Sequence, residues 1–168
     1  PATLRLTAGF RAEEHRPLSQ NTGWSLFDAA PFRPNPAADA GRLQAGLIGL
    51  VGGRIRDRDG LPTGMAFRAA ATIGTAFGGD FQANRYEVDG RVFLSLSADT
   101  RLGLRLRGGY ATGNAPPQQQ FTLGGIGSIR SYDQNALRGT RMLLGNVEYI
   151  VDGATLDDDF LDDLFLVG

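Results

Sequence analysis

The 168-residue chain contains no cysteine. Thiol catalysis, disulfide bonds and thiolate metal sites are therefore excluded. Its one histidine, His15, lies in a polar segment, so neither a histidine-based catalytic triad nor a metal site with several histidines is available. The sequence predicts no enzyme activity, no cofactor and no metal site.

Lysine is also absent, and all 17 basic residues are arginines. A GC-rich genome explains this composition as well as a preference for the planar arginine side chain, which pairs with carboxylates through two parallel hydrogen bonds in confined spaces. The net charge of -1 creates no bulk field that would attract nucleic acid or anionic lipid. We therefore expect no nucleic-acid partner.

Long hydrophobic runs are missing as well. No apolar run approaches the roughly 18 residues that a transmembrane helix requires. Membrane-spanning strands need about 10 residues each, and their apolar residues occupy alternate positions. The 24 glycines and the mean hydropathy of -0.18 are therefore compatible with a membrane barrel.

Apolar and polar residues alternate along much of the chain, which predicts long strands. In the second of them, one face is predicted to be apolar, and the other is polar apart from Ile48 and Leu50. The residues of the apolar face are Leu43, Ala45, Leu47, Gly49, Val51 and Ile55, and those of the polar face are Arg42, Gln44, Arg54 and Arg56. The predicted strands span residues 3–13, 42–56, 64–77, 84–98, 100–111 and 140–151, and Leu164–Val167 begins a seventh.

The lengths of these strands separate two fold classes. Strands of a soluble sandwich are nearer five or six residues long, whereas segments of about ten alternating residues are typical of a transmembrane barrel. Long connections follow the first and fifth strands, which places the loops after Glu14 and Thr112 outside the cell and the short turns in the periplasm. A soluble antiparallel sheet with one wet face is the alternative.

The stretch Phe121–Tyr149 combines a glycine-dense turn, an arginine at a loop tip and a following strand. It resembles the bacterial surface antigen family of outer-membrane barrels, whose superfamily includes BamA, TamA and the two-partner-secretion transporters. The sixth extracellular loop of that family carries a Val/Ile-Arg-Gly-Tyr/Phe motif after a Gly-Gly turn. The matching residues are Gly124, Gly125, Ile129, Arg130, Ser131 and Tyr132.

The strand Gly145-Asn146-Val147-Glu148-Tyr149 is similar to the next strand of the family. The resemblance implies that Arg130 and Tyr132 anchor the loop inside the barrel and that Glu148 is a candidate lumenal partner of Arg130. Two features depart from the family. Ser131 stands where the family prefers glycine, and the chain stops short of the Phe-x-Asp-x-Gly motif that supplies the usual acidic partner.

The same resemblance implies an all-β, antiparallel transmembrane barrel of sixteen strands. About seven of them fall within residues 1–168, which we expect to be a partial barrel domain truncated at both ends. The implied location is the bacterial outer membrane, and the implied role is the assembly, insertion or translocation of proteins there. Implied partners are outer-membrane lipid, polypeptide substrates, periplasmic repeat domains and accessory lipoproteins.

Two other functions remain open from the sequence. The barrel could be the membrane anchor or translocator of a fused lipase or phosphoesterase, or the chain could be a soluble β-sandwich binding module. The acidic run Asp157–Asp163 is more typical of a solvated periplasmic turn than of a cation site, and Asp57-x-Asp59-Gly60 contains half of a calcium-loop pattern.

Overall fold

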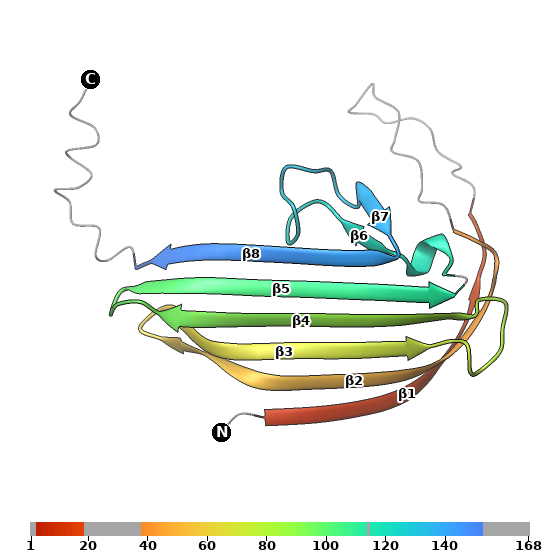
Figure 1. Cartoon of the computed structure of the whole chain (residues 1–168), viewed down its shortest axis with the longest axis horizontal. Helices are drawn as coiled ribbons and strands as arrows, with labels where there is room; N and C mark the ends of the chain where they lie inside the picture. The colour runs from red at the N-terminus through yellow and green to blue at the C-terminus, as the bar shows by residue number, and fades with distance from the viewer. Residues whose placement is uncertain (1–2, 19–37, 114, 153–168) are drawn as a thin grey trace, which may run out of the picture.

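The computed structural model describes residues 3–18, 38–113 and 115–152. Six long strands form one antiparallel sheet in the order β1-β2-β3-β4-β5-β8 (Figure 1). A short hairpin of β6 and β7, preceded by the 3-10 helix η1, lies in the connection between β5 and β8. The bounds are β1 Thr3–His15, β2 Gly41–Arg58, β3 Leu61–Ile73, β4 Ala83–Ser95, β5 Thr100–Gly113, η1 Pro117–Gln119, β6 Phe121–Leu123, β7 Leu137–Gly139 and β8 Arg141–Val151.

The connections alternate in length, as the sequence predicts. Asp59 and Gly60 join β2 to β3, both with positive φ, as two-residue hairpin turns require. Residues 96–99 join β4 to β5. β1, β3 and β5 all end at the other end of the sheet, where the longer connections begin (Figure 1). The short turns therefore mark the periplasmic end.

The pairing register sorts the side chains onto two faces, because residues directly opposite each other in neighbouring antiparallel strands share a face. Val51 faces Arg68, Arg68 faces Asp89, and Asp89 faces Arg107. We call the face that carries these residues the inner face. The face on the other side of the sheet is the outer face.

Burial in this sheet is the reverse of that in a soluble protein. Large apolar side chains of the outer face are exposed, for example Leu6 at 72%, Leu106 at 60% and Val147 at 74%. The buried apolar side chains Phe121, Met142 and Leu144 instead pack on the inner side. An outer face of this kind needs an apolar surrounding, which the acyl chains of a membrane supply. The six long strands form one sheet rather than the two packed sheets of a sandwich.

The predicted grouping of the β2 residues was right, but the face that they share is the inner face and not the face that meets lipid. Leu47, Gly49 and Val51 lie on the inner face, and the supposed exceptions Ile48 and Leu50 lie on the outer face. The same pairing places Leu43 and Ala45 on the inner side, where they are buried.

The alternation misled because two outer positions of β2 are glycines that neighbouring aromatic rings cover. A Cβ atom added to Gly46 would lie 2.7 Å from Cε2 of Phe77, and one added to Gly52 would lie 2.5 Å from Cε1 of Phe67. The apolar surface of the outer face at these positions thus comes from other segments of the chain. The alternation of residues along β2 alone cannot show an apolar surface that other segments provide.

Uncharged outer positions of β2 form a belt between Arg42 and Arg54. These two residues are twelve positions apart, which corresponds to about 40 Å along a strand. A strand tilt of about 35–45° reduces this to roughly 30 Å across the membrane. That height matches the hydrocarbon thickness of a bilayer, about 30 Å.

Other predicted boundaries also needed correction. The third strand ends at Ile73 rather than at residue 77, and the fourth ends at Ser95 rather than at residue 98. Phe77 lies in the connection that follows β3, and its ring contacts that of Phe10 with centroids 5.4 Å apart. The predicted strand at Leu164–Val167 and the acidic run Asp157–Asp163 lie outside the described residues.

The face assignment of β2 is testable with two adjacent substitutions. Ile48→Arg places a guanidinium halfway along the outer belt, so we expect it to lower the free energy of unfolding by about 2–4 kcal/mol. Leu47→Arg places the same group on the polar inner face and should cost less than about 1 kcal/mol. Urea unfolding of the protein folded into phospholipid vesicles measures both values. Equal losses would contradict the assignment.

Candidate functional site on the inner face

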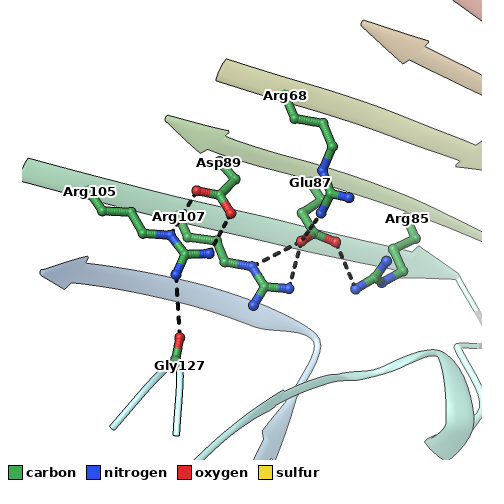
Figure 2. A network of polar contacts seen from close by, with 7 residues as sticks. All are labelled: Arg68, Arg85, Glu87, Asp89, Arg105, Arg107 and Gly127. Atoms are coloured by element: carbon green, nitrogen blue, oxygen red, sulfur yellow. Dashed lines mark hydrogen bonds and ion pairs between the residues drawn. The ribbon is translucent and has the colours of Figure 1, made fainter. Parts of the chain in front are cut away.

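A row of charged side chains crosses the inner face from β3 to β5 (Figure 2). Glu87 of β4 lies at its centre and is 8% exposed. Arg107 donates from Nε and Nη2 to Oε1 of Glu87 at 2.9 and 2.6 Å. Nη2 of Arg85 lies 3.0 Å from Oε2 of Glu87, and Nη2 of Arg68 lies 3.5 Å from Oε1. One carboxylate therefore binds guanidinium groups from three adjacent strands.

A second ion pair joins the sheet to the loop above it. Arg105 donates from Nε and Nη2 to the two carboxylate oxygens of Asp89 at 2.9 and 2.6 Å. This is the bidentate geometry that gives arginine–carboxylate pairs their strength and orientation. The remaining nitrogen, Nη1, donates to the carbonyl oxygen of Gly127 at 3.4 Å (Figure 2). Gly127 belongs to the connection between β5 and β8, so this guanidinium links the wall to the loop.

The pairing register explains why these contacts run diagonally. Glu87 lies opposite Gly109, and Asp89 lies opposite Arg107. Gly109 has no side chain that could pair with Glu87, and Arg107 reaches diagonally to that carboxylate. Arg105 reaches Asp89 by the same diagonal step. Side chains two positions out of register on adjacent strands are within reach when they are this long.

The base of the loop is fixed by Phe121, the first residue of β6. Its ring is 3% exposed and packs in a socket formed by Arg85, Gly109, Ala111 and Met142. The guanidinium carbon of Arg85 lies 4.2 Å from the ring centroid, a cation–π geometry. A Cβ atom at Gly109 would overlap the ring. Burial of a phenylalanine side chain contributes about 1.5–3 kcal/mol to holding the hairpin on the wall.

The predicted Gly-Gly turn organises the loop tip. Gly124 and Gly125 have φ values of 120° and 85°, a region that favours glycine, and a Cβ atom at Gly124 would overlap the carbonyl oxygen of Asp133. The N–H of Gly125 donates to the carbonyl oxygens of Ile129 at 3.1 Å and Tyr132 at 2.9 Å. The fold thus brings together Gly125, Ile129 and Tyr132, three residues of the predicted motif, through backbone hydrogen bonds.

Arg130 and Ser131 occupy the middle of a tight turn, in which the N–H of Tyr132 donates to the carbonyl oxygen of Ile129 at 3.2 Å. Among the described residues, the non-glycine residues with positive φ are Asp59 and Asn135. Ser131 therefore adopts a backbone conformation that any residue can take. Serine fits this position without strain.

The loop tip lies deep along the sheet. Gly127 contacts Arg105, which is eight residues from the end of β5 where the loop leaves the sheet. Eight residues of strand correspond to about 26 Å. The guanidinium of Arg105 also binds Asp89, which lies opposite Arg107, so the tip reaches about the middle of β5.

Arg130 and Glu148 line one cavity of about 360 Å³ between the loop and β8, together with Arg105 and Asn146. Both side chains are exposed, and the described part of the chain contains no ion pair between them. Tyr132 is 49% exposed. The pairing of Arg130 with Glu148 and the packing of Tyr132 on the wall stay predictions.

Sequence reasoning missed the wall residues that hold the loop. These residues are Arg85, Glu87, Asp89, Arg105, Gly109 and Phe121. Opposite charges at polar-face positions of two consecutive predicted strands were a usable signal. The partners remained unassigned because one strand pattern does not give the register between two strands.

Within the described ranges, no group of three or more histidine, cysteine, aspartate or glutamate side chains is arranged to hold a metal ion. No helix among those residues is long and apolar enough to span a membrane.

Comparison with known proteins gives one result. The family model described as the Omp85 superfamily domain matches residues 3–162, which is nearly the whole chain. No curated protein and no solved structure matches the chain.

The role of Gly109 in seating the Phe121 ring can be tested by comparing alanine substitutions at Gly109 and at the adjacent Gly108. Gly109→Ala should displace the ring and lower the local opening free energy of the β6–β7 hairpin by about 1–3 kcal/mol. Gly108→Ala is the control, because its Cβ would meet Cγ2 of Val88 at 3.5 Å, an ordinary contact on the outer face. Hydrogen exchange of residues 121–139 measures the effect. Equal exchange in both variants would show that the socket does not hold the loop.

Proposed function

This chain belongs to the Omp85 superfamily, and from that membership we propose that it inserts or translocates polypeptides with the β5–β8 loop braced inside the barrel. Omp85 barrels reside in the outer membrane and act generally in the assembly or translocation of proteins there. The superfamily is non-enzymatic, in agreement with the predicted absence of catalytic chemistry.

The observation that carries the proposal is the attachment of the loop at two separate points. Phe121 fixes its base in the socket, and Arg105 holds its tip through the carbonyl of Gly127. A loop held in this way occupies the space over the inner face while leaving its tip within reach of a passing chain. Both anchoring contacts are made with the wall of the same chain.

We further propose that Arg130 engages Glu148 when the loop is fully seated. Three features of the shared cavity favour this pairing. Glu148 offers a carboxylate on β8, Arg130 stands at the centre of the turn, and both border the same space. Oδ1 of Asn146 is buried there without a hydrogen-bond partner, so a guanidinium entering the cavity gains a second acceptor.

A spanning sheet also needs closure. The described strands end in the edges β1 and β8, and hydrocarbon does not tolerate the unpaired backbone groups of an open edge. We propose that strands beyond the six described ones complete the barrel. The sixteen-stranded architecture implied by the resemblance is the form that this closure would take.

The substitution Arg130→Ala tests whether anchoring of the loop tip is needed for the activity of the barrel. We expect it to loosen the loop tip and to lower the yield of folded outer-membrane proteins or exported substrate, with barrel expression largely intact. Arg138→Ala is the matched control, since Arg138 is an exposed arginine of β7 in the same loop. Complementation of a deletion strain and limited proteolysis of residues 124–136 measure the two effects. Unchanged protease sensitivity in Arg130→Ala would contradict the anchoring role.

The proposed partnership predicts the outcome of a charge exchange. Glu148→Arg should reproduce the defect of Arg130→Ala, because it places two guanidinium groups in one cavity. The double variant Arg130→Glu/Glu148→Arg restores opposite charges and should recover part of the activity. A double variant as defective as the worse single one would mean that the two residues are not partners.

A further inference from the structure

A second hollow lies at the short-turn end of the sheet, away from the loop. It has a volume of about 700 Å³ and is lined by residues of β1, β2 and β3. Its apolar part comes from Leu4, Met65 and Phe67, of which Leu4 is 71% exposed and Met65 57%. Leu4 and Phe67 are the side chains that a Cβ atom added to Gly52 would meet, and Gly52 is an outer-face position. This apolar part of the hollow therefore lies on the outer face. The hollow is thus continuous with the surface that faces lipid.

Arginines border the same hollow on its polar side. Arg54, Arg56 and Arg58 line it, against one acidic residue, Asp57. Oδ1 of Asp57 accepts the N–H of Gly60 at 2.9 Å, and Arg58 lies 3.8 Å from the carboxylate of Asp59. Within the described ranges, Arg54 and Arg56 are exposed and have neither a hydrogen bond nor an ion pair from their side chains.

The position of this arrangement along the membrane normal is defined by the belt of β2. Arg54 ends the uncharged outer positions of the strand, and the two-residue turn of the periplasmic side follows four residues after it. Apolar side chains therefore lie at the depth of acyl chains, and the arginines lie at the depth of headgroups. Long basic side chains at this boundary extend toward phosphate groups.

We propose that this hollow binds one anionic phospholipid of the periplasmic leaflet, with its acyl chain against Leu4, Met65 and Phe67 and its headgroup phosphate on Arg54 and Arg56. Guanidinium groups suit phosphate because their planar fork donates two hydrogen bonds to it. The excess of arginine over acid selects an anionic lipid over a zwitterionic one. The net charge of the chain, -1, plays no part, because the attraction is local to this end of β2 and β3.

Native mass spectrometry of the detergent-solubilised protein tests the proposal with two lipids of identical acyl chains, phosphatidylglycerol and phosphatidylcholine. The unmodified protein should bind phosphatidylglycerol more tightly. Arg54→Gln/Arg56→Gln should weaken the binding of phosphatidylglycerol about 25-fold, which is about fivefold for each arginine. The binding of phosphatidylcholine should stay nearly unchanged. Arg54→Lys/Arg56→Lys keeps the charge and should retain most of the preference.

The control Arg16→Gln/Arg42→Gln removes the same charge at the opposite end of the sheet and should alter lipid binding less than twofold. Met65→Trp fills the apolar part of the hollow and should weaken the binding of both lipids equally. This result tests the acyl-chain site independently of the arginines. Equal binding of the two lipids by the unmodified protein would overturn the proposal. So would a preserved preference in Arg54→Gln/Arg56→Gln, or an equal loss in the control. Protein translocation is not required for any of these outcomes, so the proposed function can fail separately.

Discussion

Hydrocarbon solvates neither backbone polar groups nor charged side chains, and this constraint arranges the whole molecule. The six long strands satisfy their backbone groups by pairing, and the outer positions of β2 along its belt are uncharged. Gln44 is the one polar side chain among the outer positions of that belt, and it carries no charge. Charges in the membrane-spanning part gather on the other face, where Glu87 and Asp89 meet arginines from β3, β4 and β5. The inner face therefore contains both the ion pairs and the packed apolar groups.

Glycine contributes to this structure by leaving space for other groups. On the outer face, Gly46 and Gly52 leave space for the rings of Phe77 and Phe67 to approach the backbone of β2 closely. On the inner face, Gly109 leaves the space that the Phe121 ring fills. A side chain at any of these positions would push a neighbour away. The 24 glycines of the chain thus include several that define how segments distant in sequence fit together.

Hydrogen bonds within the loop determine its shape, and contacts with the sheet determine its position. The loop supplies its own shape, because the N–H of Gly125 gathers the carbonyls of Ile129 and Tyr132 around the turn that carries Arg130. The wall supplies position through the Phe121 socket and the Arg105 contact with Gly127. Ion pairs such as Arg105–Asp89 hold the wall side chains in orientation, since bidentate geometry restricts rotation of the guanidinium.

Sequence alone determined the number of long strands over the described part, most of their bounds to within a few residues, the alternation of short and long connections and the motif at Gly124–Tyr132. These features are local: period-two spacing, turn residues and a contiguous motif are all written along one segment. The sequence did not predict the short strands β6 and β7. Tertiary structure decided which face of β2 meets lipid, which arginine meets which carboxylate, and that Phe121 rests over Gly109. Each of these depends on the register between strands, which shifts every side chain to the other face with a slip of one residue.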